Sequence, residues 1–157
     1  MSKDEVMKVI ERAKELKVMG LDFLESHSIE DVCRDYNGIG PQFLPERLRG
    51  KVTSLLAIYE PAAAVHDLRF GKSDGTRKAF DYANCEFYVN CHKCAKAEYP
   101  WWSWKRYRAY AVIDAMHEFN CADFGGWRAW LDAHEARAKD GISTGGAVPS
   151  GNKENER

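Results

Sequence analysis

The chain has no long apolar run. Its longest uncharged stretches fall far short of the ~18 apolar residues that a membrane-spanning helix needs. The N-terminal sequence MSKDE is charged and has no apolar stretch of the kind that a signal peptide carries. The polar and apolar alternation that is typical of strands is missing as well. These absences predict a cytoplasmic protein of the all-α class.

A strong charge of one sign is also missing. The 23 Lys and Arg residues and the 24 Asp and Glu residues give a formal net charge of -1. The field of the whole protein therefore neither favours nor excludes a nucleic-acid partner, and there is no strong nucleic-acid signal. A length of 157 residues indicates one domain, and a hydrophobic content of 45% is enough for a single core.

The five cysteines are an odd number, which argues against a complete disulfide framework. Cys91 and Cys94 have the spacing of a zinc-chelating pair, and Cys85 lies six residues before Cys91. Zinc usually requires four ligands, and the remaining cysteines and histidines are scattered singly along the chain. Cys91 and Cys94 also fall inside a helical pattern. We interpret them as small core residues, which makes zinc unlikely, while a structural zinc or a redox pair remains the alternative.

Apolar periodicity and turn residues divide the chain into helices. Residues 3–25 are predicted to form one amphipathic helix that packs on the body or on a partner, and a short helix follows at 29–34. Two glycines and two prolines mark a shaped loop at 36–45. Further helices are predicted at 46–57, 61–70, 76–98, from about 104 to 119, and at 127–137. We expect an N-terminal helical region at 1–35, a helical domain at 36–138 and a disordered tail at 139–157.

The helix predicted at 61–70 carries His66 followed by Asp67. Consecutive side chains on a helix are about 100° apart, so neither is expected to orient the other, but both can face adjacent points of one site. There the imidazole could activate a water molecule and the carboxylate could hold a cation. The alternative is a packed core histidine beside a surface carboxylate.

Three segments together resemble the phospholipase A2 superfamily. They are the loop Tyr-Asn-Gly-Ile-Gly-Pro at 36–41, the helix His-Asp-Leu-Arg-Phe at 66–70 and the segment Ala-Asn-Cys-Glu-Phe at 83–87. The resemblance implies an all-α fold in which two antiparallel helices, 61–70 and 76–98, carry the site. It also implies that Asp67 and the backbone of Gly38 and Gly40 bind calcium, and that His66 activates water to attack an ester.

The chain is most similar to the compact, disulfide-free members of that superfamily. It resembles the parvovirus capsid phospholipase domain and, above all, small phage and prophage proteins that end in Phe-Gly-Gly-x-x-x-Trp, here residues 124–130. The resemblance spans residues 36–130. It implies that the protein is encoded by a phage or prophage and works in the host cytoplasm.

Two positions depart from the superfamily pattern. Phe70 replaces a tyrosine, and Asn84 replaces the aspartate that orients the histidine. Asp81, three residues before Asn84 on the same predicted helix, could take over that orienting role. The first hypothesis is therefore a calcium-dependent phospholipase A2-like hydrolase acting on phospholipid membranes. A second is a non-catalytic phage accessory protein that binds a host protein and could form a homo-oligomer through residues 3–25, and a third is a zinc-stabilised nucleic-acid-binding module.

Residues 99–110 combine aromatic rings with positive charge and contain no acidic residue. Such a mixture suits a membrane interface, where tryptophans tolerate the boundary and cations meet anionic headgroups. It also suits single-stranded nucleic acid or a protein partner. In a third interpretation the aromatic rings cap the core where two helices meet. The candidate contact residues are Trp101, Trp102, Trp104, Lys105, Arg106 and Arg108.

Overall fold

The computed structural model describes residues 2–36, 56–121 and 126–139, and all regular structure within these ranges is helical. The predicted all-α class is therefore confirmed. In chain order the elements are α1 (Lys3–Leu16), α2 (Leu21–Glu25), α3 (Ile29–Asp35), the single 3-10 turn η1 (Ala57–Tyr59), α5 (Glu60–Lys72), α6 (Arg77–Glu98), α7 (Trp104–Cys121) and α8 (Arg128–Lys139).

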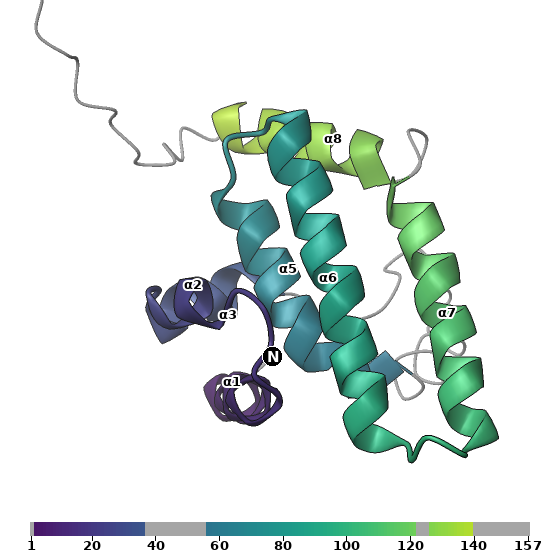
Figure 1. The fold of residues 1–157 in the computed structure, drawn as a ribbon. Coiled ribbons are helices and arrows are strands. Elements are labelled where there is room, and N and C mark those ends of the chain that lie inside the picture. The colour runs from purple at the N-terminus through teal and green to yellow at the C-terminus, as the bar shows by residue number, and fades with distance from the viewer. Residues whose placement is uncertain (1, 37–55, 122–125, 140–157) are drawn as a thin grey trace, which may run out of the picture.

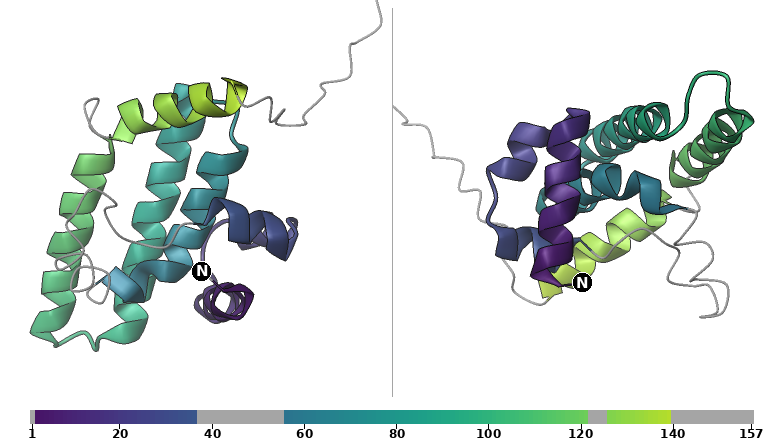
Figure 2. Two further views of the ribbon diagram at one scale, coloured as in Figure 1. Left: turned by 180° about the vertical axis from the view of Figure 1, so that it is seen from behind. Right: turned by 90° about the horizontal axis from the view of Figure 1, so that it is seen from below.

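The helices α5, α6 and α7 lie side by side and form the body of the molecule (Figure 1). In Figure 1, α5, α6 and α7 are seen lengthwise and α1 is seen end-on. In the view from below in Figure 2, α1 is seen lengthwise, so α1 crosses the three helices at a steep angle. Helix α8 lies across the end of α5 and α6 that is remote from the α6–α7 connection (Figure 1). None of the described helices is long and apolar enough to span a membrane.

Helix α5 lies at the centre because its first half is made of small residues. Pro61 occupies the first turn, where its missing N–H costs nothing. Residues 62–65, three alanines and a valine, are all buried, so neighbouring helices approach the backbone closely. Val6, Val32 and Cys91, from α1, α3 and α6, belong to the same core as α5. The predicted helix at 61–70 is confirmed and runs slightly further in both directions.

Helix α6 begins where the sequence predicts. The Thr76 hydroxyl accepts a hydrogen bond of 3.2 Å from the Ala79 N–H and caps the helix. Six residues that share one face of α6 are buried. These residues are Phe80, Ala83, Asn84, Phe87, Cys91 and Cys94.

The single helix predicted at 3–25 is wrong. The chain leaves the helical conformation between α1 and α2, with Lys17 at φ 49° and Gly20 at φ 78°. The backbone groups freed by this break find a distant partner. The side chain of Asn90 accepts a hydrogen bond of 2.7 Å from the Met19 N–H and donates one of 2.9 Å to the Met19 carbonyl. We call this pair of bonds the Asn90 clasp.

The apolar face of α1 packs on the body of the molecule. Val6, Val9 and Ala13 are buried in the core that α5, α6 and α7 share. Packing on the body is one of the two alternatives predicted for the N-terminal helix, and contact with a second chain through residues 3–25 stays a prediction. The packing of α1 also means that the boundary predicted between residues 35 and 36 does not separate two cores.

A second apolar cluster lies under α8. Trp130 is fully buried against Phe80 and Ala83 of α6, and Phe70 of α5 packs on the same group. His134 of α8 hydrogen-bonds the hydroxyl of Ser73, which follows α5, at 2.8 Å. Helix α8 thereby closes one end of the α5–α6 pair. The other predicted elements, the loop 37–45, most of the helix 46–57 and the tail after residue 139, lie outside the described residues.

Candidate functional site

The structure brings His66 and Asn84 together across two helices. The imidazole Nε2 of His66 on α5 lies 3.2 Å from the amide Oδ1 of Asn84 on α6. The two residues are 18 positions apart in the sequence, so the contact depends on how α5 packs against α6. Asn84 is fully buried, which gives its amide little freedom to choose another partner.

The Asn84 amide has a defined orientation, and this orientation selects the tautomer of a neutral His66 ring. The amide nitrogen donates a hydrogen bond of 3.1 Å to the Phe80 carbonyl, an oxygen that can only accept. The amide oxygen therefore faces His66 and accepts a hydrogen bond from a protonated Nε2. A neutral imidazole carries one proton, so the lone pair resides on Nδ1, the nitrogen that would act as a base.

Asp67 lies beside that lone pair. Its Oδ1 is 3.4 Å from the Nδ1 of His66, a long contact at the edge of hydrogen-bonding range. The two side chains therefore lie closer together than their consecutive positions on the helix suggest. When Nδ1 takes up a proton, the Asp67 carboxylate is positioned to stabilise the resulting positive charge.

Aromatic rings flank the histidine. The Phe70 and Phe87 ring centroids are 4.4 and 4.7 Å from the centroid of the imidazole. Phe70 in turn meets Trp130 edge-on at 4.2 Å. These contacts leave the side chain of His66 only 13% exposed and that of Asp67 25% exposed. Partial burial of this kind strengthens electrostatic interactions between the two side chains.

Asp81 does not take over the orienting role. Its Oδ1 accepts a hydrogen bond of 3.0 Å from the Nε of Arg77, one turn earlier on the exposed face of α6. Its side chain is 54% exposed, whereas Asn84 is buried. Their spacing of three residues places Asp81 and Asn84 on the same side of the helix, but only Asn84 is buried in the core.

The proposed calcium ligands are only partly described. Asp67 supplies one carboxylate, while Gly38 and Gly40 lie outside the described residues. Calcium usually takes six to eight oxygen ligands, so Asp67 alone could not hold it. Among the described residues no group of three or more His, Cys, Asp or Glu side chains is arranged to bind a metal ion.

Cys91 and Cys94 are core residues, as the sequence indicates. Both are buried in α6. Burial raises the pKa of the Cys94 thiol to about 11 and raises the pKa of Cys91 as well. Because the thiolate is the nucleophile, these raised pKa values work against nucleophilic or redox chemistry at either thiol near neutral pH, and the absence of zinc stays a prediction. Cys85, by contrast, is exposed.

The tryptophans at the α6–α7 connection do not cap the core. Trp101, Trp102 and Trp104 are 71%, 69% and 64% exposed, so that interpretation is wrong. Lys105 and Arg108 are exposed as well. Arg106 differs, because its Nε donates a hydrogen bond of 2.7 Å to the Tyr110 hydroxyl.

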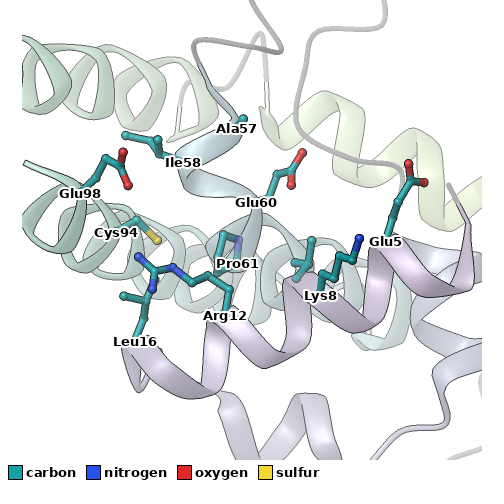
Figure 3. A pocket seen from close by; sticks show the side chains of 11 residues that line it. Glu5, Lys8, Arg12, Leu16, Ala57, Ile58, Glu60, Pro61, Cys94 and Glu98 are labelled. Carbon is teal, nitrogen blue, oxygen red and sulfur yellow. The ribbon is translucent and has the colours of Figure 1, made fainter.

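A cavity lies elsewhere in the molecule, and no feature of the sequence predicted it. It measures about 520 Å³ and lies between α1, the start of α5 and the end of α6 (Figure 3). Charges of both signs surround it, and burial together with nearby Glu5 raises the pKa of Glu60. Burial keeps its only described thiol, Cys94, protonated near neutral pH, whereas Glu60, with its raised pKa, could act as a general acid or base. The His66 pair is favoured over this cavity because the described lining of the cavity contains no histidine. Its charged residues are Glu5, Lys8, Arg12, Glu60 and Glu98.

A buried ion pair near the site was also missed. Arg69 donates hydrogen bonds of 2.9 and 3.2 Å to the carboxylate of Glu86, which is 2% exposed. A Cβ atom on Gly20 would come within 2.6 Å of the same carboxylate. The pair therefore helps to fix α2 against α5 and α6. The sequence signal that could have revealed this ion pair is Glu86, a single glutamate on an otherwise buried face of α6.

Comparison with protein-family models, curated proteins and solved structures finds no match for this chain.

Proposed function

We propose that the protein is a phospholipase A2-like ester hydrolase in which His66 activates the attacking water. The observation that carries the proposal is the contact between His66 Nε2 and Asn84 Oδ1. That contact leaves the lone pair on Nδ1 beside the Asp67 carboxylate. A base next to a carboxylate, partly shielded from water, is the arrangement that such a hydrolysis requires.

In this mechanism Nδ1 of His66 removes a proton from water while the water oxygen bonds to the ester carbonyl carbon. The carbonyl π electrons move to the carbonyl oxygen. When the C=O bond re-forms, the bond to the alcohol oxygen breaks, and Nδ1 returns its proton to that oxygen. A fatty acid and a lysophospholipid leave. Asn84 holds the ring, and Asp67 stabilises the positive charge on it.

Calcium is part of the proposal because the motif resemblance implies it. Asp67 would hold the ion together with backbone oxygens of the loop that contains Gly38 and Gly40. A bound divalent cation would stabilise the negative charge that develops on the carbonyl oxygen.

The test is fatty-acid release from mixed phospholipid vesicles, with calcium and with a chelator. Loss of a general base should lower the rate by about 10²–10⁴-fold, so His66→Ala should reduce release to background. His27→Ala is the matched control, because that histidine follows α2 and its imidazole contacts Ser26 and the Phe23 carbonyl, not the site. No release above the His66→Ala level, in a folded sample and across several lipids, would sink the proposal.

A non-catalytic binding role is the second candidate. Asn84 favours it, because a neutral amide cannot stabilise an imidazolium as a carboxylate does, and the aspartate-to-asparagine change in a catalytic triad costs about 10⁴ in rate. Here Asp67 would provide the only described carboxylate in contact with His66. A negative hydrolysis assay with an intact fold would favour this candidate.

A further inference from the structure

The tip of the molecule between α6 and α7 exposes three tryptophans on an ordered turn. The Ser103 N–H donates a hydrogen bond of 3.0 Å to the Pro100 carbonyl, which makes Trp101 and Trp102 the two central residues of a β-turn. Central residues of a protruding turn have little protein to pack against. Trp104 opens α7 directly behind them. We call Trp101, Trp102 and Trp104 the tryptophan tip.

Positive charge accompanies the tryptophan tip. Lys105 and Arg108 lie one and four residues after Trp104 on α7, and both are exposed. Between residues 99 and 110 there is no acidic residue. The guanidinium of Arg106 is turned inward to the Tyr110 hydroxyl and the Tyr99 carbonyl, so it anchors the connection rather than adding to its outer charge.

A small hollow lies next to the tip. It measures about 200 Å³ between η1 and α7, with Tyr59, Tyr99 and Val112 in its wall. The Tyr59 hydroxyl donates a hydrogen bond of 3.2 Å to the Ala109 carbonyl and so fixes the wall. Trp104, Lys105 and Arg108 also line it. An apolar hollow with two cations beside it has the chemistry of a site for an anionic amphiphile.

We propose that the tryptophan tip docks on an anionic phospholipid surface, with Lys105 and Arg108 facing the headgroups. Tryptophan prefers the boundary between hydrocarbon and water, and cations near an anionic leaflet are attracted to it. The proposal does not depend on hydrolysis at His66. Asn84 lies about 20 Å along α6 from Glu98, so the tip and the histidine can be altered separately.

Two features favour a membrane over nucleic acid. The rings of Trp101 and Trp102 meet edge-on at 88°, so they do not form parallel platforms for successive bases. The exposed cations of the tip, Lys105 and Arg108, lie between two exposed acidic residues, Glu98 on α6 and Asp114 on α7. These acidic residues interrupt a cationic path along the two described helices that a nucleic-acid strand could follow.

The test is co-sedimentation of the full chain with vesicles of phosphatidylcholine, alone or mixed with an equal amount of phosphatidylglycerol. We expect binding to the mixed vesicles and little to phosphatidylcholine alone. Lys105→Gln with Arg108→Gln should weaken binding to the mixed vesicles by about 30-fold, at roughly five-fold per cation. Trp101→Ser with Trp102→Ser should weaken it by roughly ten-fold or more, because less apolar surface enters the interface.

Matched controls remove equal charge and an equally exposed ring at other places. Lys78→Gln with Arg128→Gln, both exposed and remote from the tip, and Phe119→Ser, at the far end of α7, should bind as the unaltered chain does. Unchanged melting temperatures show that the variants fold. Tip variants that bind like the controls would overturn the proposal, as would absence of vesicle binding or tip-dependent capture of a single-stranded oligonucleotide instead. A soluble short-chain ester assay reports on His66 whichever result is obtained.

Discussion

Two buried asparagines on α6 have opposite kinds of partner. Asn84 and Asn90 are both fully buried and lie less than two turns apart. Asn90 directs both ends of its amide to the backbone of Met19. Asn84 uses its nitrogen for the Phe80 carbonyl but directs its oxygen to the imidazole of His66. One amide completes a backbone turn, and the other holds a titratable side chain.

The difference separates a structural polar residue from a chemical one. Asn84 and Asn90 have the same residue type, are equally buried and both have hydrogen-bond partners, so none of these properties identifies function. The kind of partner identifies it. A backbone turn needs only the right shape, whereas an imidazole held by one nitrogen has its other nitrogen available for proton transfer. Three changes test this distinction, and they are considered from the largest expected effect to the smallest.

Asn90→Ala should have the largest effect, and it should act on stability. It leaves the Met19 N–H and carbonyl without their partner, which should lower the free energy of unfolding by about 2–4 kcal/mol. Urea denaturation followed by circular dichroism measures the change. Hydrolysis per folded molecule should stay as it is, since the Asn90 clasp does not touch His66.

A matched change in the same clasp checks this interpretation. Asn90→Asp keeps the oxygen that receives the Met19 N–H but removes the donor to the Met19 carbonyl, so it should be destabilising as well. If Asn90→Ala abolished activity in a sample that remained folded, the comparison between the two asparagines would be broken.

The break between α1 and α2 shows where prediction from sequence reaches its limit. The starts of α5 and α6 follow from Pro61 and Thr76, which act on the backbone next to them, and both were predicted. The turn at Lys17–Gly20 is stabilised by Asn90, 71 residues away from Met19. The apolar periodicity of residues 3–25 carries no information about such a distant contact. Gly20 was therefore interpreted as a tolerated glycine inside one continuous helix.

The candidate site shows a similar division. His66, Asp67 and Asn84 could be named from motif order, and the packing of α5 on α6 brings them together. Helical spacing alone could not decide between Asn84 and Asp81, because both fit one helix face. Motif order pointed to Asn84, and the depth of the core separates the two residues. The exposure of the tryptophan tip could not be predicted either, because aromatic rings that cap a core and rings that protrude into solvent have the same composition.

Asn84→Asp should have the second largest effect, and it should act on the rate. A carboxylate at Asn84 would stabilise the imidazolium directly, and we expect roughly a ten- to hundred-fold gain in hydrolysis, about 1.4–2.7 kcal/mol in the barrier. The same change removes the donor to the Phe80 carbonyl and should lower stability by about 1 kcal/mol. Vesicle hydrolysis and urea denaturation measure the two effects. A rate that does not rise would mean that Asn84 is a structural residue like Asn90.

A charged contact at the surface gives the smallest effect and the sharpest contrast with the neutral Asn90 clasp. Asp31 of α3 accepts hydrogen bonds from Lys72 of α5 at 2.9 Å, from Ser28 at 2.7 Å and from Arg34 at 2.6 Å. These donors, Lys72 foremost, hold the pKa of the Asp31 carboxyl below its usual range. A depressed pKa in the folded state stabilises the fold above the unfolded-state pKa of about 4 and loses that contribution as pH falls through and below it.

Asp31→Asn should therefore lower the melting temperature by a few degrees at neutral pH, and the difference from the unaltered chain should shrink below a pH of about 4. Lys72→Gln should behave in the same way, because it removes the main donor. The loss caused by Asn90→Ala should not depend on pH, since an amide does not titrate. Melting curves of the three variants from neutral to acid pH measure this difference. If the melting-temperature difference between Asp31→Asn and the unaltered chain did not change with pH, the charge of Asp31 would not contribute. Asp31 would then act only as a hydrogen-bond acceptor, as the neutral amide of the Asn90 clasp does.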